Sequence, residues 1–170
     1  FYIAVSSFEW FPGIPIYHSR DMKSWELYSH ALQNDREPDL RKLPSAKGIW
    51  APCLTYCEAD ELFYVVYGVM NSMNARYFDV DNYLITAKDP KGPWSEPVYL
   101  HSTGFDASMF HDDDGKKYIV ALDWETRTAY EKPGPINIVE YDPEKKTIVG
   151  MPKAFWRGGT DRGLSLIHIS

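Results

Sequence analysis

One carboxylate in the sequence has neighbours that suit chemistry better than solvent exposure. Asp106 lies in the segment TGFDASMFHDDDG, residues 103–115, between the aromatic Phe105 and the small residues Ala107 and Ser108. A carboxylate at the start of an apolar strand is costly to bury unless it is paired or used. Asp106 is therefore a candidate functional carboxylate, although its sequence neighbours alone favour a structural role. The alternative is a carboxylate that only satisfies backbone donors in a tight turn.

The acidic residues that follow Asp106 have a simpler explanation. Residues 112–114 are all Asp and precede Gly115, and Asp-Gly after a strand is typical of a hairpin turn. They lack the fuller ligand spacing of a calcium loop. No Ser/His/Asp or Cys/His arrangement and no Gly-rich phosphate loop accompanies them. We therefore expect no metal and no cofactor.

The composition is that of a globular chain and disfavours two classes of partner. Of the 170 residues, 44% are hydrophobic and 25% are charged, which excludes a disordered chain. The net charge is -6 and the basic residues are scattered, which disfavours nucleic acid binding. The longest apolar run, residues 62–70, is too short to span a bilayer. Cys53 and Cys57 would be roughly 13 Å apart on one strand, too far for a disulfide.

The hydrophobic pattern predicts an all-β fold, because no segment keeps a helical period. Turn residues separate short apolar runs, which is typical of strands. Residues 33–48 and 71–81 are expected to be long loops, and such loops often carry function. The expected strands are residues 1–7, 14–19, 25–30, 53–57, 62–70, 83–87, 94–100, 105–110, 117–124, 136–141, 147–149 and 153–156.

Similar strand segments recur along the chain. Residues 1–5 (FYIAV), 62–66 (LFYVV) and 117–121 (KYIVA) are alike, and the last two each follow an acidic turn. A second element, residues 17–21 followed by Trp25, recurs as residues 84–89 followed by Trp94. About four short strands per unit is typical of propeller blades. A β-sandwich with coincidental turn similarity is the alternative.

Four segments together resemble glycoside hydrolase family 43, closest to its β-xylosidase group of exo-acting enzymes. They are SSFEWFPGIPIYHSRDMKSWE, GIWAPCLTY, NYLITAKDPKGPWSEPVYL and GFDASMFHDDDGKKY. The resemblance covers residues 1–163 and implies a five-bladed β-propeller, of which about three blades are present. Residues 164–170 are expected to be a non-native tail. The resemblance does not separate β-xylosidase from α-L-arabinofuranosidase.

The resemblance implies hydrolysis with inversion, in which one carboxylate activates water and a second carboxylic acid protonates the leaving oxygen. A third carboxylate tunes the pKa of the acid and orients it, and Asp106 in GFDAS matches that third position. The family's base precedes the strand that begins at Phe1. Its acid, a Glu, follows a Gly-Thr-Asp segment like residues 159–161, after which this sequence has no Glu. The chain alone is therefore expected to lack activity.

The resemblance also implies which aromatic residues bind the sugar. Trp50 in GIWAP matches one wall of the subsite for the terminal sugar, Phe8 in SSFEWFPG matches a second, and Phe105 is expected to face the same pocket. Rings of this kind stack on sugar C–H faces, although packing between blades is the alternative for each. Trp124 and Arg127 are further candidates for the cleft. The expected partner is a xylo-oligosaccharide or an arabinoxylan-derived sugar. A non-catalytic carbohydrate-binding propeller and a protein-interaction propeller are the competing functions.

Overall fold

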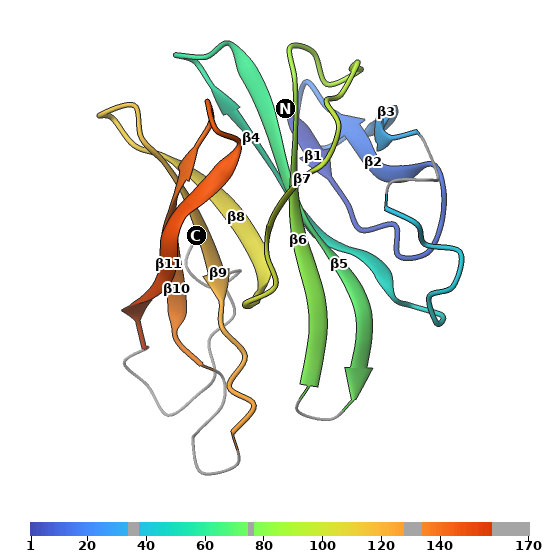
Figure 1. The fold of residues 1–170 in the computed structure, drawn as a ribbon. Helices are drawn as coiled ribbons and strands as arrows, with labels where there is room; N and C mark the ends of the chain where they lie inside the picture. The colour runs from blue at the N-terminus through green and yellow to red at the C-terminus, as the bar shows by residue number, and fades with distance from the viewer. Residues whose placement is uncertain (34–37, 75–76, 128–133, 158–170) are drawn as a thin grey trace.

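The computed structural model describes residues 1–33, 38–74, 77–127 and 134–157. Within these ranges the chain is all-β, with three antiparallel sheets in which strands adjacent in sequence are also adjacent in space (Figure 1). The first sheet contains β1 (Tyr2–Ala4), β2 (Gly13–His18) and β3 (Glu26–Leu32). The second contains β4 (Gly48–Cys57), β5 (Leu62–Asn74), β6 (Tyr77–Ala87) and β7 (Val98–His101). The third contains β8 (Phe105–His111), β9 (Lys117–Leu122), β10 (Ile136–Asp142) and β11 (Thr147–Trp156).

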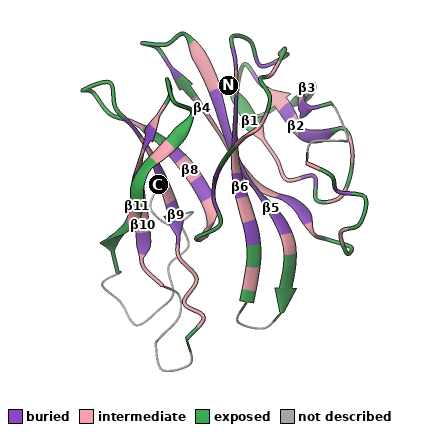
Figure 2. Cartoon of the chain, viewed as in Figure 1, coloured by how far each residue is buried: buried purple, intermediate pink, exposed green. Residues whose placement is uncertain are grey.

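The second sheet lies between the other two, and its apolar run is buried on both faces. Along β5, Val65 and Tyr67 pack into the core shared with the first sheet. Tyr64 and Val66 pack into the core shared with the third sheet. Because side chains of a strand alternate between faces, a strand covered on both sides is continuously apolar. Figure 2 shows this burial in the middle of β5 and β6, with exposed residues at the far ends of both strands.

The sheets are arranged as blades of a β-propeller. The first strand of the third sheet, β8, contacts β4 and β5 of the second, and β1 of the first sheet contacts β4. First strands of successive sheets that lie side by side are typical of blades around an axis. The predicted all-β propeller fold is therefore confirmed. The part of the chain that the structure describes contains no helical segment that could span a lipid bilayer.

Several expected strands begin or end a few residues away from the observed ones, for example 53–57 against β4 and 94–100 against β7, and two further expectations are wrong about the elements themselves. Residues 71–81 were expected to form a loop, but β5 continues to Asn74 and β6 begins at Tyr77 (Figure 1). The two strands extend beyond the core, so their side chains are mostly exposed there and carry no apolar pattern. The separate strands expected at residues 147–149 and 153–156 are one strand, β11, whose pairing with β10 contains register shifts.

The candidate site residues and the tight turns lie at opposite ends of the second and third sheets. The starts of β4 and β8 lie at the end that we call the site end, because Trp50 and Asp106 are there. The β4–β5 turn, residues 58–61, and the β8–β9 turn, residues 112–116, lie at the opposite end, which we call the turn end (Figure 1). Residues 158–170, including the expected tail at 164–170, lie outside the described residues.

Candidate active site

The structure places Phe8 directly beside the start of β4. The Phe8 N–H donates to the Ile49 carbonyl at 3.0 Å, and the Ile49 N–H donates to the Phe8 carbonyl at 2.9 Å. Gly48 allows this approach, because it has φ +93° and a Cβ there would lie 2.3 Å from the Phe8 carbonyl oxygen. Only glycine tolerates both conditions. Phe8 and Trp50 are the two residues expected to form aromatic walls. Because Phe8 pairs with Ile49, it lies next to the residue that precedes Trp50.

Neither ring is sequestered in the core. Phe8 leaves 41% of its surface exposed, and Trp50 is half-buried. The Trp50 indole N–H donates to the Ala46 carbonyl at 3.1 Å, and the Lys47 ammonium lies 5.7 Å from the ring centroid. A register shift between Trp50 and Cys53 turns the strand at this point, and bulges of this kind re-aim side chains. The Trp50 orientation is therefore set by contacts within residues 46–50.

Asp106 lies at the start of β8 in an unusual backbone conformation. Its φ is 52°, in the left-handed region, and the pairing of β8 with β9 shifts register between Phe105 and Ser108. The side chain is half-buried. Burial raises the pKa of the Asp106 carboxyl above its usual value, because a charged carboxylate is less stable away from water.

Phe105 belongs to an aromatic cluster beside Asp106. Phe78 stacks on Trp124 with ring centroids 4.7 Å apart and an interplanar angle of 5°. The Phe105 ring meets them edge-on, 5.1 Å from Phe78 and 5.7 Å from Trp124. The cluster lines a cavity of about 360 Å³, and Thr103 and Asn137 also line it.

Three further residues, Trp124, Arg127 and Phe78, show what the sequence did and did not reveal about this end of the molecule. Trp124, a sequence candidate for the cleft, lines the cavity, whereas Arg127 forms a two-pronged ion pair with Glu125. Phe78 was missed, because it lies in the stretch expected to be a loop. The adjacent aromatic residues Tyr77 and Phe78 in an otherwise mostly polar stretch were the signal available.

A row of backbone partners connects the two groups of candidate residues across the second sheet. Trp50 pairs with Gly68, and Gly68 pairs with Asn82. The Asn82 side-chain amide then donates to the Gly104 carbonyl at 2.8 Å, two residues before Asp106. The structure therefore brings Phe8 and Trp50 to the same end of the molecule as Phe105 and Asp106.

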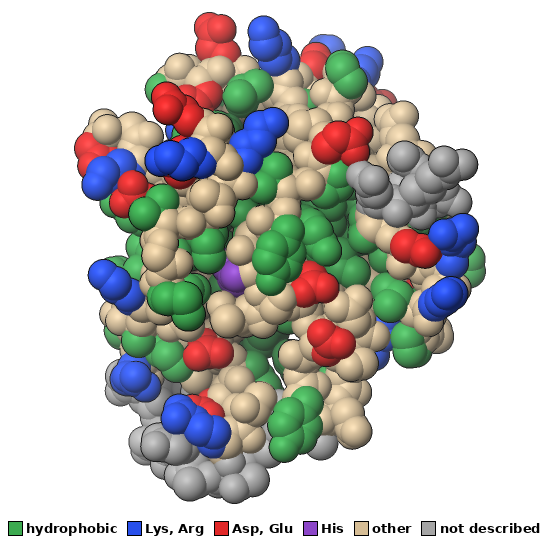
Figure 3. All heavy atoms as spheres, in the orientation of Figure 1, with side chains coloured by type: hydrophobic (Ala, Val, Ile, Leu, Met, Phe, Trp, Pro, Cys, Tyr) green, Lys and Arg blue, Asp and Glu red, His purple; other side chains and the backbone are tan. Residues whose placement is uncertain are grey.

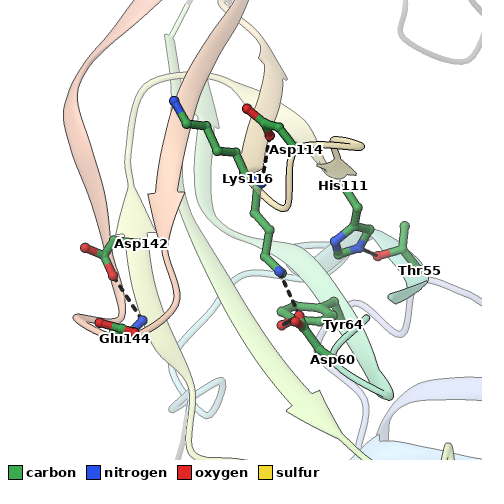
Figure 4. A network of polar contacts seen from close by, with 9 residues as sticks. Thr55, Asp60, Tyr64, His111, Asp114, Lys116, Asp142 and Glu144 are labelled. Atoms are coloured by element: carbon green, nitrogen blue, oxygen red, sulfur yellow. Dashed lines mark hydrogen bonds and ion pairs between the residues drawn. The ribbon is translucent and has the colours of Figure 1, made fainter. Parts of the chain in front are cut away.

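The turn end contains a partly buried polar cluster that sequence reasoning missed (Figure 4). The Lys117 ammonium lies 2.7 Å from the Asp60 carboxylate, and the Tyr64 hydroxyl donates to the same carboxylate oxygen at 2.5 Å. His111 lies beside Tyr64, with ring centroids 5.0 Å apart, and contacts the Thr55 hydroxyl at 2.9 Å. The signal was a lysine that opens an apolar strand. This cluster joins the second and third sheets.

Two smaller expectations are confirmed. Residues 112–115 form an exposed turn between β8 and β9, in which the Gly115 N–H donates to the Asp112 carbonyl at 3.0 Å. Cys53 and Cys57 are both free thiols. The described residues contain no group of three or more His, Cys, Asp or Glu side chains placed to hold a metal ion.

The chain thus combines propeller sheets with a half-buried carboxyl and several aromatic rings at one end of those sheets. The family model for "Glycosyl hydrolases family 43" matches residues 1–167, and the chain belongs to this family. It is 44% identical to a β-xylosidase of Bacillus subtilis (strain 168), over 99% of this chain and 32% of that protein. It is 42% identical to a xylosidase/arabinosidase 43B of Humicola insolens, over 96% of this chain and 30% of that protein.

Solved structures agree with this assignment. A xylan β-1,4-xylosidase from Bacillus halodurans C-125 superposes with a TM-score of 0.88 at 42% identity, covering 94% of this chain and 30% of that one. Among the curated proteins, a non-reducing end α-L-arabinofuranosidase of Bacteroides ovatus is also similar, with 37% identity over 88% of this chain and 26% of that protein. The chain spans about a third of the length of the Bacillus subtilis and Humicola insolens relatives.

Proposed function

We propose that the complete protein hydrolyses O-glycosidic bonds in xylo-oligosaccharides or arabinose-substituted xylan. It acts from the chain end and inverts the configuration at the cleaved sugar. Residues 1–163 form part of its catalytic propeller. The observation that carries this proposal is Asp106, a half-buried carboxyl with a raised pKa in the GFDAS segment of a family 43 chain.

Asp106 is proposed to act through the general acid. Inverting glycosidases place a general base and a general acid far enough apart to admit a water molecule. The acid must keep its proton near neutral pH, and a neighbouring carboxylate helps because a second negative charge disfavours ionisation. Asp106 is therefore a positioning residue that raises the pKa of the acid and orients it. Since the sequence after Asp161 contains no Glu, we propose that residues 1–170 alone are inactive.

Phe8, Trp50 and Phe105 are proposed to bind the terminal sugar through ring faces that stack on C–H groups. The accessible surface of Phe8 and the anchored indole of Trp50 support this role. The names of the relatives, which include β-xylosidase and α-L-arabinofuranosidase, support xylose and arabinose as the two sugars to test.

The proposal is tested by Asp106→Asn in the complete protein, assayed on aryl β-xyloside and aryl α-arabinofuranoside. Losing the carboxylate misplaces and acidifies the general acid, so kcat should fall by about 10²–10⁴-fold while KM changes little. Asp114→Asn, in the exposed β8–β9 turn, is the matched control and should leave both constants unchanged. An unchanged rate in Asp106→Asn would refute the assignment. Sugar binding without turnover in the unaltered protein would instead support a carbohydrate-binding propeller.

A further inference from the structure

We propose that Asn82 is a positioning residue for Asp106, holding the segment between the second and third sheets from which β8 begins. The inference rests on the proposed function, in which Asp106 orients the general acid. Asn82 lies on β6, outside every segment in which we placed a candidate site residue.

The side chain of Asn82 is fully buried and makes two directed hydrogen bonds. Its amide nitrogen donates to the His101 carbonyl at 3.2 Å and to the Gly104 carbonyl at 2.8 Å. Because carbonyl oxygens only accept hydrogen bonds, the amide nitrogen has to face them, and the orientation of the side chain is fixed. Both amide hydrogens are therefore used on one short piece of backbone.

The amide oxygen of Asn82 destabilises the fold, in contrast to the amide nitrogen. The oxygen Oδ1 is buried and has no hydrogen-bond partner among the described residues. Its neighbour across the sheet is Gly68, where a Cβ would lie 3.6 Å from this oxygen. A buried unpaired carbonyl is destabilising, so packing alone favours an apolar side chain here. The two donated bonds are the compensation.

Those bonds hold the 102–104 link, the three residues between β7 and β8. Gly104 has φ +108°, and a Cβ there would lie 2.7 Å from the Leu122 carbonyl oxygen. The Leu122 backbone of the third sheet therefore packs closely against Gly104, while the Asn82 amide of the second sheet donates to the Gly104 carbonyl. The backbone is thus held between two sheets immediately before Asp106.

Asp106 needs such support. The left-handed region is strained for residues other than glycine, and even Asp, which tolerates it better than most, keeps such a backbone only where its surroundings support it. Asp106 has φ 52° within the register shift of β8, so the direction of its carboxyl depends on how the preceding residues are held. Releasing the Gly104 carbonyl lets this backbone relax and moves the carboxyl.

The test compares four variants of the complete protein: Asn82→Leu, Asn82→Ser, Leu84→Ala and Asp106→Asn. Asn82→Leu keeps the approximate size of the side chain and removes the donors. Leu84→Ala is the matched control, because Leu84 is buried on the same strand in the core shared with the third sheet, without a hydrogen bond to the link. Each variant is measured for kcat, KM, thermal midpoint and the pH profile of kcat.

Asn82→Leu should lower kcat by ~10–100-fold with KM nearly constant, because a displaced carboxyl serves the acid poorly. The alkaline limb, which reports the pKa of the acid, should move to lower pH, as it does in Asp106→Asn. Leu84→Ala should lower the thermal midpoint and leave that limb in place. If Asn82→Leu does not fold, Asn82→Ser is measured in its stead, with the same shift expected.

The outcomes separate the two proposals. If Asp106→Asn moves the limb and neither Asn82 variant does, the role of Asn82 is overturned and the proposed function stands. If Asp106→Asn leaves both the rate and the limb unchanged, the proposed function fails and the role of Asn82 fails with it. A limb that moves equally in Leu84→Ala shows a general packing effect and also overturns the inference.

Discussion

Lys117 and Asp60 form an ion pair whose partners are buried to very different degrees. The Lys117 side chain is 4% exposed, whereas the Asp60 side chain is 29% exposed. Removing one partner leaves the other charge behind, and the penalty depends on how well water can reach it. An ammonium stranded inside the blade interface is therefore worse than a carboxylate stranded near its edge.

We predict that Asp60→Asn destabilises the complete protein more than Lys117→Met does. Asp60→Asn leaves a buried ammonium without its counter-charge and should cost about 3–5 kcal/mol. Lys117→Met keeps the apolar stem, and Tyr64 still donates to the carboxylate, so the expected loss is about 1–3 kcal/mol. Urea denaturation of both variants and of the double variant measures these losses. Equal losses in the two single variants would contradict the argument from burial.

The pH dependence of the same pair provides a control. Burial by itself raises the pKa of Asp60, but the hydrogen bonds from Lys117 and Tyr64 outweigh it and leave the pKa below its usual 3.8. A carboxyl with a lowered folded-state pKa contributes stability above its unfolded pKa, and this is lost as pH falls through the folded value. The difference between the unaltered protein and Asp60→Asn should therefore shrink below pH 3.8. A constant difference would mean that Asp60 does not act through its charge.

At the level of elements, the contact between the 8–12 loop and β4 is predicted to depend on Gly48. In Gly48→Ala, the new Cβ has to avoid the Phe8 carbonyl, so the Phe8–Ile49 bridge opens and the Phe8 ring moves. We expect KM for the aryl xyloside to rise by about tenfold, corresponding to ~1.4 kcal/mol of lost binding.

Gly115→Ala is the matched control for this prediction. Gly115 also has a positive φ, +85°, but nothing lies within 4 Å of a Cβ placed there. Both variants therefore carry the strain of a side chain in the left-handed region, and only Gly48→Ala collides with backbone. Gly115→Ala should lower the thermal midpoint and leave KM unchanged. A similar KM in both variants would show that the bridge does not position Phe8.

The elements that the sequence predicted well are those with a buried face. The central runs of β5 and β9 were found because their apolar side chains fill the cores between sheets. The exposed end of β5 and the exposed start of β6, within residues 71–81, were missed, because exposed strand residues show no hydrophobic period. Asn82 was missed for a related reason: an isolated Asn in a strand carries no sign of the backbone that its amide will meet. The segments around Phe8, Trp50 and Asp106 were found from local motifs, whereas their shared location required the tertiary fold.

For the whole molecule, the sheets at either side of the array leave apolar side chains uncovered. On β11, Met151 is 76% exposed and Phe155 is 70% exposed, and Phe1 and Ile3 are exposed at β1. Acidic and basic side chains are interspersed with hydrophobic ones on the face shown in Figure 3, rather than gathered by sign. No concentrated patch of one charge on this face opposes the approach of a second copy. The strands β1 and β11, at the ends of their sheets, offer both exposed apolar side chains and free edges for association.

We predict that residues 1–170, produced alone, self-associate. Exposed edge strands that carry large apolar side chains pair readily with other copies, so light scattering after gel filtration should show species larger than a monomer. Met151→Lys combined with Phe155→Lys places charges on β11 and should increase the monomer fraction, because charged side chains on an edge strand oppose pairing. Lys145→Met, in the exposed β10–β11 turn, removes a charge away from the strand pairing and should not increase it. A monodisperse monomer of the unaltered chain with a cooperative thermal transition would show that these three sheets are sufficient as a folding unit.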